Sequence, residues 1–156
     1  MVKKIELGFP EIDTNVKATL LEDEEPELCD ALWKNLENPV NLICRHSVST
    51  GDEFGAAERP PKHAVRTGTQ AVPLGRKKSL FSRIEPGSIS YAISGGYGGI
   101  TVVYGLCTEP MPARGAIVAK VDKADKNNLV KGGKYVWNSQ YITHRLAKMT
   151  VKRSME

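Results

Sequence analysis

The chain has 156 residues and a formal net charge of +4 at pH 7, and 40% of its residues are hydrophobic and 26% charged. This length and composition are typical of one globular domain and exclude wholesale disorder. No apolar run approaches the length of about 18 residues that a membrane-spanning helix needs. The first residues lack the apolar stretch of a signal peptide, so we expect a cytoplasmic protein without membrane association.

The N-terminal residues predict two strands joined by a turn. Residues 3–9 alternate between apolar and polar side chains, with Ile5 and Leu7 on one face. Residues 16–20 alternate again after a turn at 10–13. A period of two indicates strands, and the short connection favours an antiparallel hairpin.

A helix is predicted next. Asp23 is the expected N-cap, Pro26 suits the first helical turn, and Asn38-Pro39 ends the pattern. Apolar side chains recur at a spacing of four, which gathers them on one face. We expect this face to lie in the core with four side chains: Leu28, Leu32, Trp33 and Leu36.

The rest of the chain reads mainly as strands. Five further strands are predicted at 40–48, 89–93, 100–106, 115–121 and 146–152. The polar stretch from Asp122 is interpreted as a short helix that ends at Gly132-Gly133. About seven strands and one principal helix predict a mainly-β domain, and closing the strands into a barrel hides their edges.

A long basic loop interrupts this pattern at about 51–83, where no periodicity lasts. Its basic residues are Arg59, Lys62, Arg66, Arg76, Lys77, Lys78 and Arg83, with no acidic residue between the first and the last. Such a stretch is either a functional loop or a disordered insertion. We expect it to fold over a pocket or to pack on a neighbouring subunit of a homo-oligomer. Phe81 is the one aromatic residue between Arg59 and Arg83, which argues against nucleic-acid binding by base stacking.

The three cysteines, Cys29, Cys44 and Cys107, are odd in number and widely spaced. They fit buried thiols in a reducing cytoplasm better than disulfides. His63 and His144 show no metal-ligand spacing to each other or to a cysteine. The sequence therefore predicts no metal site and no cofactor.

Several local strings resemble the small bacterial cyclophilin-like proteins, in particular the group known as DUF3830. The matching segments are residues 20–29, Trp33, the strand that ends in His46, residues 85–89, Tyr104-Gly105 and Glu109-Pro110. This resemblance implies a cyclophilin-type barrel that a helix closes at one end.

Two activities follow from related proteins. True cyclophilins are prolyl isomerases with a Phe-His-Arg strand, whereas this chain has Cys44-Arg45-His46 and no Phe-Met-x-Gln. The reversed order turns the arginine and the histidine to opposite faces relative to that family. The chain also resembles, more distantly, the catalytic domains of cucumopine and mikimopine synthases, which join histidine to 2-oxoglutarate and close a ring by a Pictet–Spengler reaction without a redox cofactor.

His46 is the leading catalytic candidate. It stands where a strand passes from apolar to polar residues, with Thr50 and Asp52 close behind it in the sequence. Imidazole takes up and releases protons near neutral pH. The alternative is a structural histidine, hydrogen-bonded at the barrel rim. Because Leu42 and Cys44 share its side of the strand, we expect His46 to face the cavity while the adjacent arginine does not.

Tyr104 and Glu109 bracket the end of another strand. A phenol there can donate to a developing anion, and a carboxylate can act as a base. The alternatives are a core tyrosine and a surface glutamate. Arg45, Arg59 and Arg66 are candidate clamps for a substrate carboxylate, or else surface charges.

These residues lead to one main hypothesis and two rivals. The main hypothesis is a cyclophilin-like enzyme that uses acid–base chemistry on a small anionic, amino-acid-derived molecule, by imine formation or cyclisation. One rival is a prolyl isomerase. The other is a non-catalytic binding module whose basic loop contacts an acidic partner or RNA.

Overall fold

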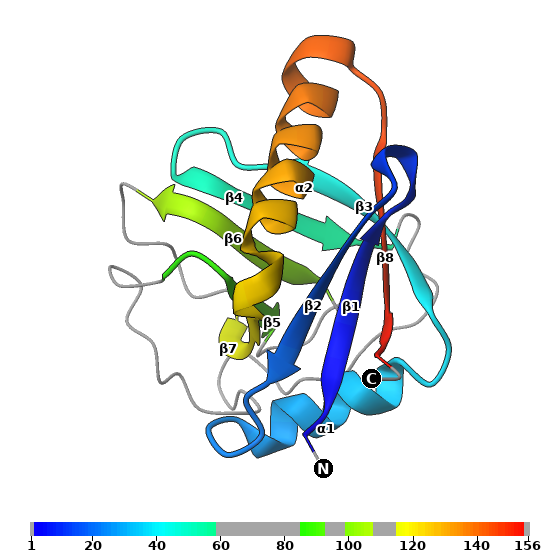
Figure 1. Ribbon diagram of the computed structural model, residues 1–156, viewed down its shortest axis with the longest axis vertical. Helices are drawn as coiled ribbons and strands as arrows, with labels where there is room; N and C mark the ends of the chain where they lie inside the picture. Colours follow the sequence, from blue (N-terminus) through cyan, green and yellow to red (C-terminus); the bar gives the residue numbers. More distant parts are fainter. Residues whose placement is uncertain (1, 59–84, 93–98, 108–114, 155–156) are drawn as a thin grey trace.

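Alternating side chains from eight strands meet inside a closed antiparallel barrel in the part of the chain that this computed structural model describes, residues 2–58, 85–92, 99–107 and 115–154 (Figure 1). The strands are β1 (Lys4–Phe9), β2 (Thr14–Leu20), β3 (Val40–His46), β4 (Gly51–Ala57), β5 (Ser88–Ala92), β6 (Ile100–Cys107), β7 (Gly115–Val121) and β8 (Ala147–Arg153). Their order around the barrel is β1-β2-β7-β5-β6-β4-β3-β8, and β8 pairs with β1 to close the circle. The predicted closed barrel is confirmed.

The N-terminal hairpin is also confirmed. β1 and β2 pair antiparallel from Lys4 opposite Thr19 to Phe9 opposite Thr14. A short 3-10 turn, η1 (Pro10–Ile12), connects them, and Asp13 leaves it in the left-handed conformation with φ of 48°. Alternate residues of the hairpin contribute to the core, as the sequence pattern indicates.

The fourth strand corrects the prediction of a loop over 51–83, because Gly51–Ala57 form β4 between β3 and β6. The pairing with β6 shifts between Gly51 and Glu53, and this bulge leaves both Glu53 and Phe54 buried. The bulge and the run of small residues hide the alternation that would indicate a strand. The rest of the basic loop, residues 59–83, lies outside the described residues.

Helix α1 (Pro26–Asn35) lies across one end of the barrel, at the bottom of Figure 1. The helix begins one residue after its N-cap Glu25, so the expected cap at Asp23 is wrong, while Pro26 occupies the first turn as predicted. Three of the four predicted core side chains, Leu28, Leu32 and Leu36, are fully buried, and Trp33 is partly buried against the same core.

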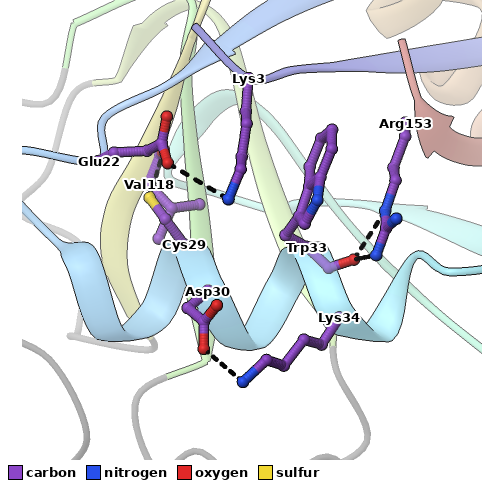
Figure 2. A network of polar contacts seen from close by, with 8 residues as sticks. All are labelled: Lys3, Glu22, Cys29, Asp30, Trp33, Lys34, Val118 and Arg153. Carbon is purple, nitrogen blue, oxygen red and sulfur yellow. Dashed lines mark hydrogen bonds and ion pairs between the residues drawn. The ribbon is translucent and has the colours of Figure 1, made fainter. Parts of the chain in front are cut away.

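Polar contacts fasten α1 to the barrel (Figure 2). The indole of Trp33 lies between two cations: the Arg153 guanidinium is 4.6 Å and the Lys3 ammonium 5.3 Å from its ring centre. Arg153 also donates from Nε and Nη2 to the carbonyl oxygen of Trp33, at 3.0 and 2.6 Å. The Cys29 thiol donates to the Val118 carbonyl of β7 at 3.4 Å. The helix is therefore held to both β7 and β8.

Helix α2 (Lys126–Asn138) covers the opposite end, since it contacts β2, β3, β4 and β6 from different sides of the barrel. The prediction that this helix ends at Gly132-Gly133 is wrong. A Cβ at Gly132 would lie 2.5 Å from the Phe9 ring, and one at Gly133 would lie 2.3 Å from the Tyr104 ring. The two glycines thus let α2 approach the core closely, and they do not terminate it.

A short 3-10 turn, η3 (Lys123–Asp125), precedes α2, and a π-helical turn, η4 (Ser139–Thr143), follows it. The chain then leaves η4 through His144 and enters β8. No helix among the described residues is long and apolar enough to cross a membrane.

Candidate functional site

The end of β3 carries the leading candidate, His46. Along this strand Leu42, Cys44 and His46 are buried, whereas Arg45 is exposed. The side chains of Arg45 and His46 therefore face in opposite directions, as their adjacent positions in a strand require. His46 is 4% exposed and shares the inward face with the core, so its surroundings are set by the barrel interior and by α2.

Two hydrogen bonds define the state of the His46 ring. Nδ1 lies 2.9 Å from the Ser47 carbonyl oxygen, and Nε2 lies 2.7 Å from the Tyr104 hydroxyl. A carbonyl oxygen only accepts, so Nδ1 carries the proton. Nε2 of the neutral ring is then the acceptor, and the Tyr104 hydroxyl donates to it. When the ring is protonated, the direction of this second hydrogen bond reverses.

The Tyr104 side chain comes from β6 and reaches the His46 ring from a different strand. Its ring contacts Phe54, with centroids 6.4 Å apart, and it lies beneath Gly133 of α2. Burial, assisted by the charge of Asp52 and then by Cys107, raises the pKa of Tyr104 to about 12. The phenol therefore stays protonated and available as a hydrogen-bond donor across the neutral range.

This pKa predicts a loss of stability in strong alkali. The pKa of Tyr104 is near its ordinary value of 10.0 in the unfolded chain, whereas it is about 12 in the folded protein. The contribution is complete below pH 10 and is lost as the pH rises through 12. We expect the tyrosinate absorbance of wild type minus that of Tyr104→Phe to titrate with a midpoint near 12. A difference curve centred near 10 would contradict this assignment.

Residues of η4 cover His46. Gln140 Oε1 accepts a hydrogen bond of 2.8 Å from the His46 backbone N–H. The Tyr141 ring packs edge-on against the imidazole, with centroids 6.4 Å apart, and its hydroxyl donates to the Ser47 carbonyl at 3.1 Å. Sequence reasoning missed Gln140 and Tyr141, because only the fold brings this turn over β3.

Two further candidates lie where β3 passes into β4. The Thr50 hydroxyl donates to Glu53 Oε2. Asp52 packs against Gly105 of β6, where a Cβ would lie 2.3 Å from Asp52 Oδ2. The structure thus places both residues at the β3–β4 end near Tyr104. It adds Glu53, a buried carboxylate that sequence analysis did not select.

Arg45 lies apart from the His46–Tyr104 pair. It lines a cavity of about 430 Å³ between the end of β3, η4 and the start of β8. The lining residues are Ile43, Cys44, Arg45, Ser139, Gln140, His144, Arg145, Leu146 and Ala147. Of the predicted site residues, only Arg45 belongs to this set. Glu109, Arg59 and Arg66 lie outside the described residues.

The cysteines have no partner in a disulfide. Cys29 and Cys44 are buried and Cys107 is half-buried, and all three are free. Burial raises the pKa of both Cys29 and Cys44 to about 12, so these thiols are poor nucleophiles at neutral pH. Within residues 2–58, 85–92, 99–107 and 115–154, no three His, Cys, Asp or Glu side chains gather as a metal ion would require.

Comparison with known proteins supports the fold. No family model and no curated protein matches the chain, so membership of DUF3830 stays a prediction. Among solved structures the chain is similar to McbB in complex with tryptophan, with a TM-score of 0.75 and 25% identity over 97% of this chain. The chain spans 45% of the McbB chain. This similarity and the closed barrel confirm the predicted cyclophilin-like fold class.

Proposed function

We propose that the protein is a small-molecule enzyme that acts by acid–base chemistry on an anionic, amino-acid-derived substrate. The observation that carries this proposal is the 2.7 Å hydrogen bond between His46 Nε2 and the Tyr104 hydroxyl. It joins a proton acceptor and a proton donor from separate strands at one end of the barrel. The fold shared with McbB, which binds tryptophan in its solved structure, supports an amino acid as ligand.

The proposed reaction is imine formation followed by ring closure of the Pictet–Spengler type. A substrate amine attacks a carbonyl carbon, a C–N bond forms, and the carbonyl oxygen leaves as water after taking up protons. An aromatic carbon then attacks the iminium carbon, a C–C bond forms, and a base removes the proton left on the ring. Tyr104 donates to the departing oxygen, and His46 Nε2 takes the ring proton.

Entry of the substrate requires the turn η4, which covers His46, to move. Both rings are nearly enclosed, with 4% of His46 and 7% of Tyr104 exposed. Tyr141 therefore gives up its contact with the His46 ring when the substrate approaches. Thr50 and Asp52 border the same end of the barrel, whereas Arg45 faces the other side of β3.

The test is a condensation assay. Tryptophan with an aldehyde, and histidine with 2-oxoglutarate, are incubated with the protein, and mass spectrometry searches for the sum of the reactants minus one water. We expect His46→Gln and Tyr104→Phe each to lower the rate at least about 100-fold, the usual scale for a lost acid or base.

The matched control is Tyr135→Phe. Tyr135 of α2 is half-buried, and its hydroxyl donates to Glu11. This variant should keep the wild-type rate. The proposal fails if neither amine gives a condensation product, or if a folded His46→Gln variant reacts as fast as the wild type.

A further inference from the structure

The pocket beside Arg45 exists because β8 leaves β3 early. The two strands pair from Val40 opposite Val151 to Cys44 opposite Ala147. Beyond this point the chain bends away toward η4, so the last residues of β3 have no β8 neighbour. The His46 N–H, which would otherwise face a strand, is satisfied by the side chain of Gln140. The space left between the two diverging segments is the 430 Å³ cavity.

The polar wall of this cavity is positively charged. Arg45 comes from β3, and His144 and Arg145 come from the segment before β8. No aspartate or glutamate belongs to the lining set. Among the described residues neither arginine forms an ion pair. Two arginines thus line one cavity, and a guanidinium matches the planar fork of a carboxylate.

The backbone around the cavity is unusual as well. His144 adopts φ of 56° and ψ of 40°, the left-handed conformation that a non-glycine residue rarely occupies. It follows directly on the π-helical turn η4. Both features cost conformational energy and are enriched at functional sites. Here they turn the 144–146 segment toward Arg45.

Apolar residues line the cavity as well. Ile43, Leu146 and Ala147 belong to the lining set, and Leu146 is 63% exposed. An inorganic anion would leave this surface in water. A hydrocarbon segment of a ligand would cover it, because removal of apolar surface from water is favourable.

We infer that this pocket binds a small organic dianion, with one carboxylate on Arg45, the other on Arg145 and its hydrocarbon part against the apolar lining residues. The site is distinct from the His46–Tyr104 pair, since Arg45 faces the other side of β3. The binding of this anion does not rest on the proposed function. Because Gln140 lines the pocket and also holds the His46 backbone, an occupant of the pocket touches the element that covers the catalytic pair.

Isothermal titration calorimetry with glutarate tests the inference, because glutarate has two carboxylates but no amine or carbonyl that can react. Glutarate should bind, and acetate and inorganic phosphate should each bind at least about tenfold more weakly. Arg45→Gln and Arg145→Gln should each weaken the binding of glutarate at least about tenfold, since each removes a charge-assisted hydrogen bond to a carboxylate. Arg45→Lys should give an intermediate loss of glutarate affinity, because lysine keeps the positive charge but lacks the two parallel donors of a guanidinium.

Lys34→Gln on α1 is the charge-matched control at the other end of the barrel, and it should leave glutarate affinity unchanged. The inference is overturned if the protein does not bind glutarate, or if neither arginine variant changes the affinity for glutarate. It is also overturned if the protein binds glutarate no more tightly than phosphate. His46→Gln separates the two proposals. It should bind glutarate like the wild type even where condensation is lost, while condensation without glutarate binding would overturn this site alone.

Discussion

Replacing Leu32 by alanine should lower the free energy of unfolding by about 2–5 kcal/mol, the range for a buried leucine that leaves a cavity. Leu32 is 2% exposed and lies on the inward face of α1, where it closes one end of the barrel. Urea denaturation of wild type and variant measures the difference. Neighbouring strands cannot collapse onto the vacated space, because the barrel is closed by hydrogen bonds all round.

Lys34→Ala serves as the control on the same helix. Lys34 is exposed and pairs with Asp30 one turn earlier, a contact worth about 0.5 kcal/mol at most. A loss below about 1 kcal/mol for Leu32→Ala would mean that α1 is not a structural closure of the barrel.

Gly133→Ala should destabilise the protein by about 1–3 kcal/mol, although alanine normally favours a helix by about 1 kcal/mol over glycine. The new Cβ would lie 2.3 Å from Tyr104 Cδ1, so either α2 or the Tyr104 ring must shift. A shift of the ring also lengthens its hydrogen bond to His46. Thermal and urea unfolding measure the stability, and the condensation assay measures the effect on the catalytic pair.

Two further variants isolate this steric cause. Lys134→Ala changes the next residue on the exposed face of α2 and should alter stability by no more than about 0.5 kcal/mol. Tyr104→Leu combined with Gly133→Ala should cost less than the sum of the single changes, because the smaller side chain yields to the new methyl group. Stabilisation by Gly133→Ala alone would contradict the close approach of α2.

The strands that alternate cleanly were predictable. β1, β2 and β8 place apolar residues at every second position, and this pattern alone indicates their buried face. β4 was not predicted, because a bulge puts Glu53 and Phe54 on consecutive buried positions. The length of α2 escapes because Gly132-Gly133 resembles a helix end, and only the rings of Phe9 and Tyr104 explain why the helix continues.

One part of the candidate site was predictable from the sequence, and another part was not. That His46 and Tyr104 meet follows from two inward positions near the ends of strands, which a barrel can bring together. The pocket at Arg45 was not predictable, because it depends on where β8 separates from β3. Neither His144 nor Arg145 has a sequence neighbourhood that distinguishes it from a surface residue.

The pairing of β8 with β1 governs the order in which the barrel can assemble. Ile5 faces Arg153 across this pair, so β1 gains its second neighbour only after residue 153 has emerged from the ribosome. Until then β1 and β3 both present open edges, which are templates for pairing with other chains. Contacts this distant in sequence also slow folding, since the loop between them must close first. The barrel therefore depends on β8 to cover the open edges of both β1 and β3.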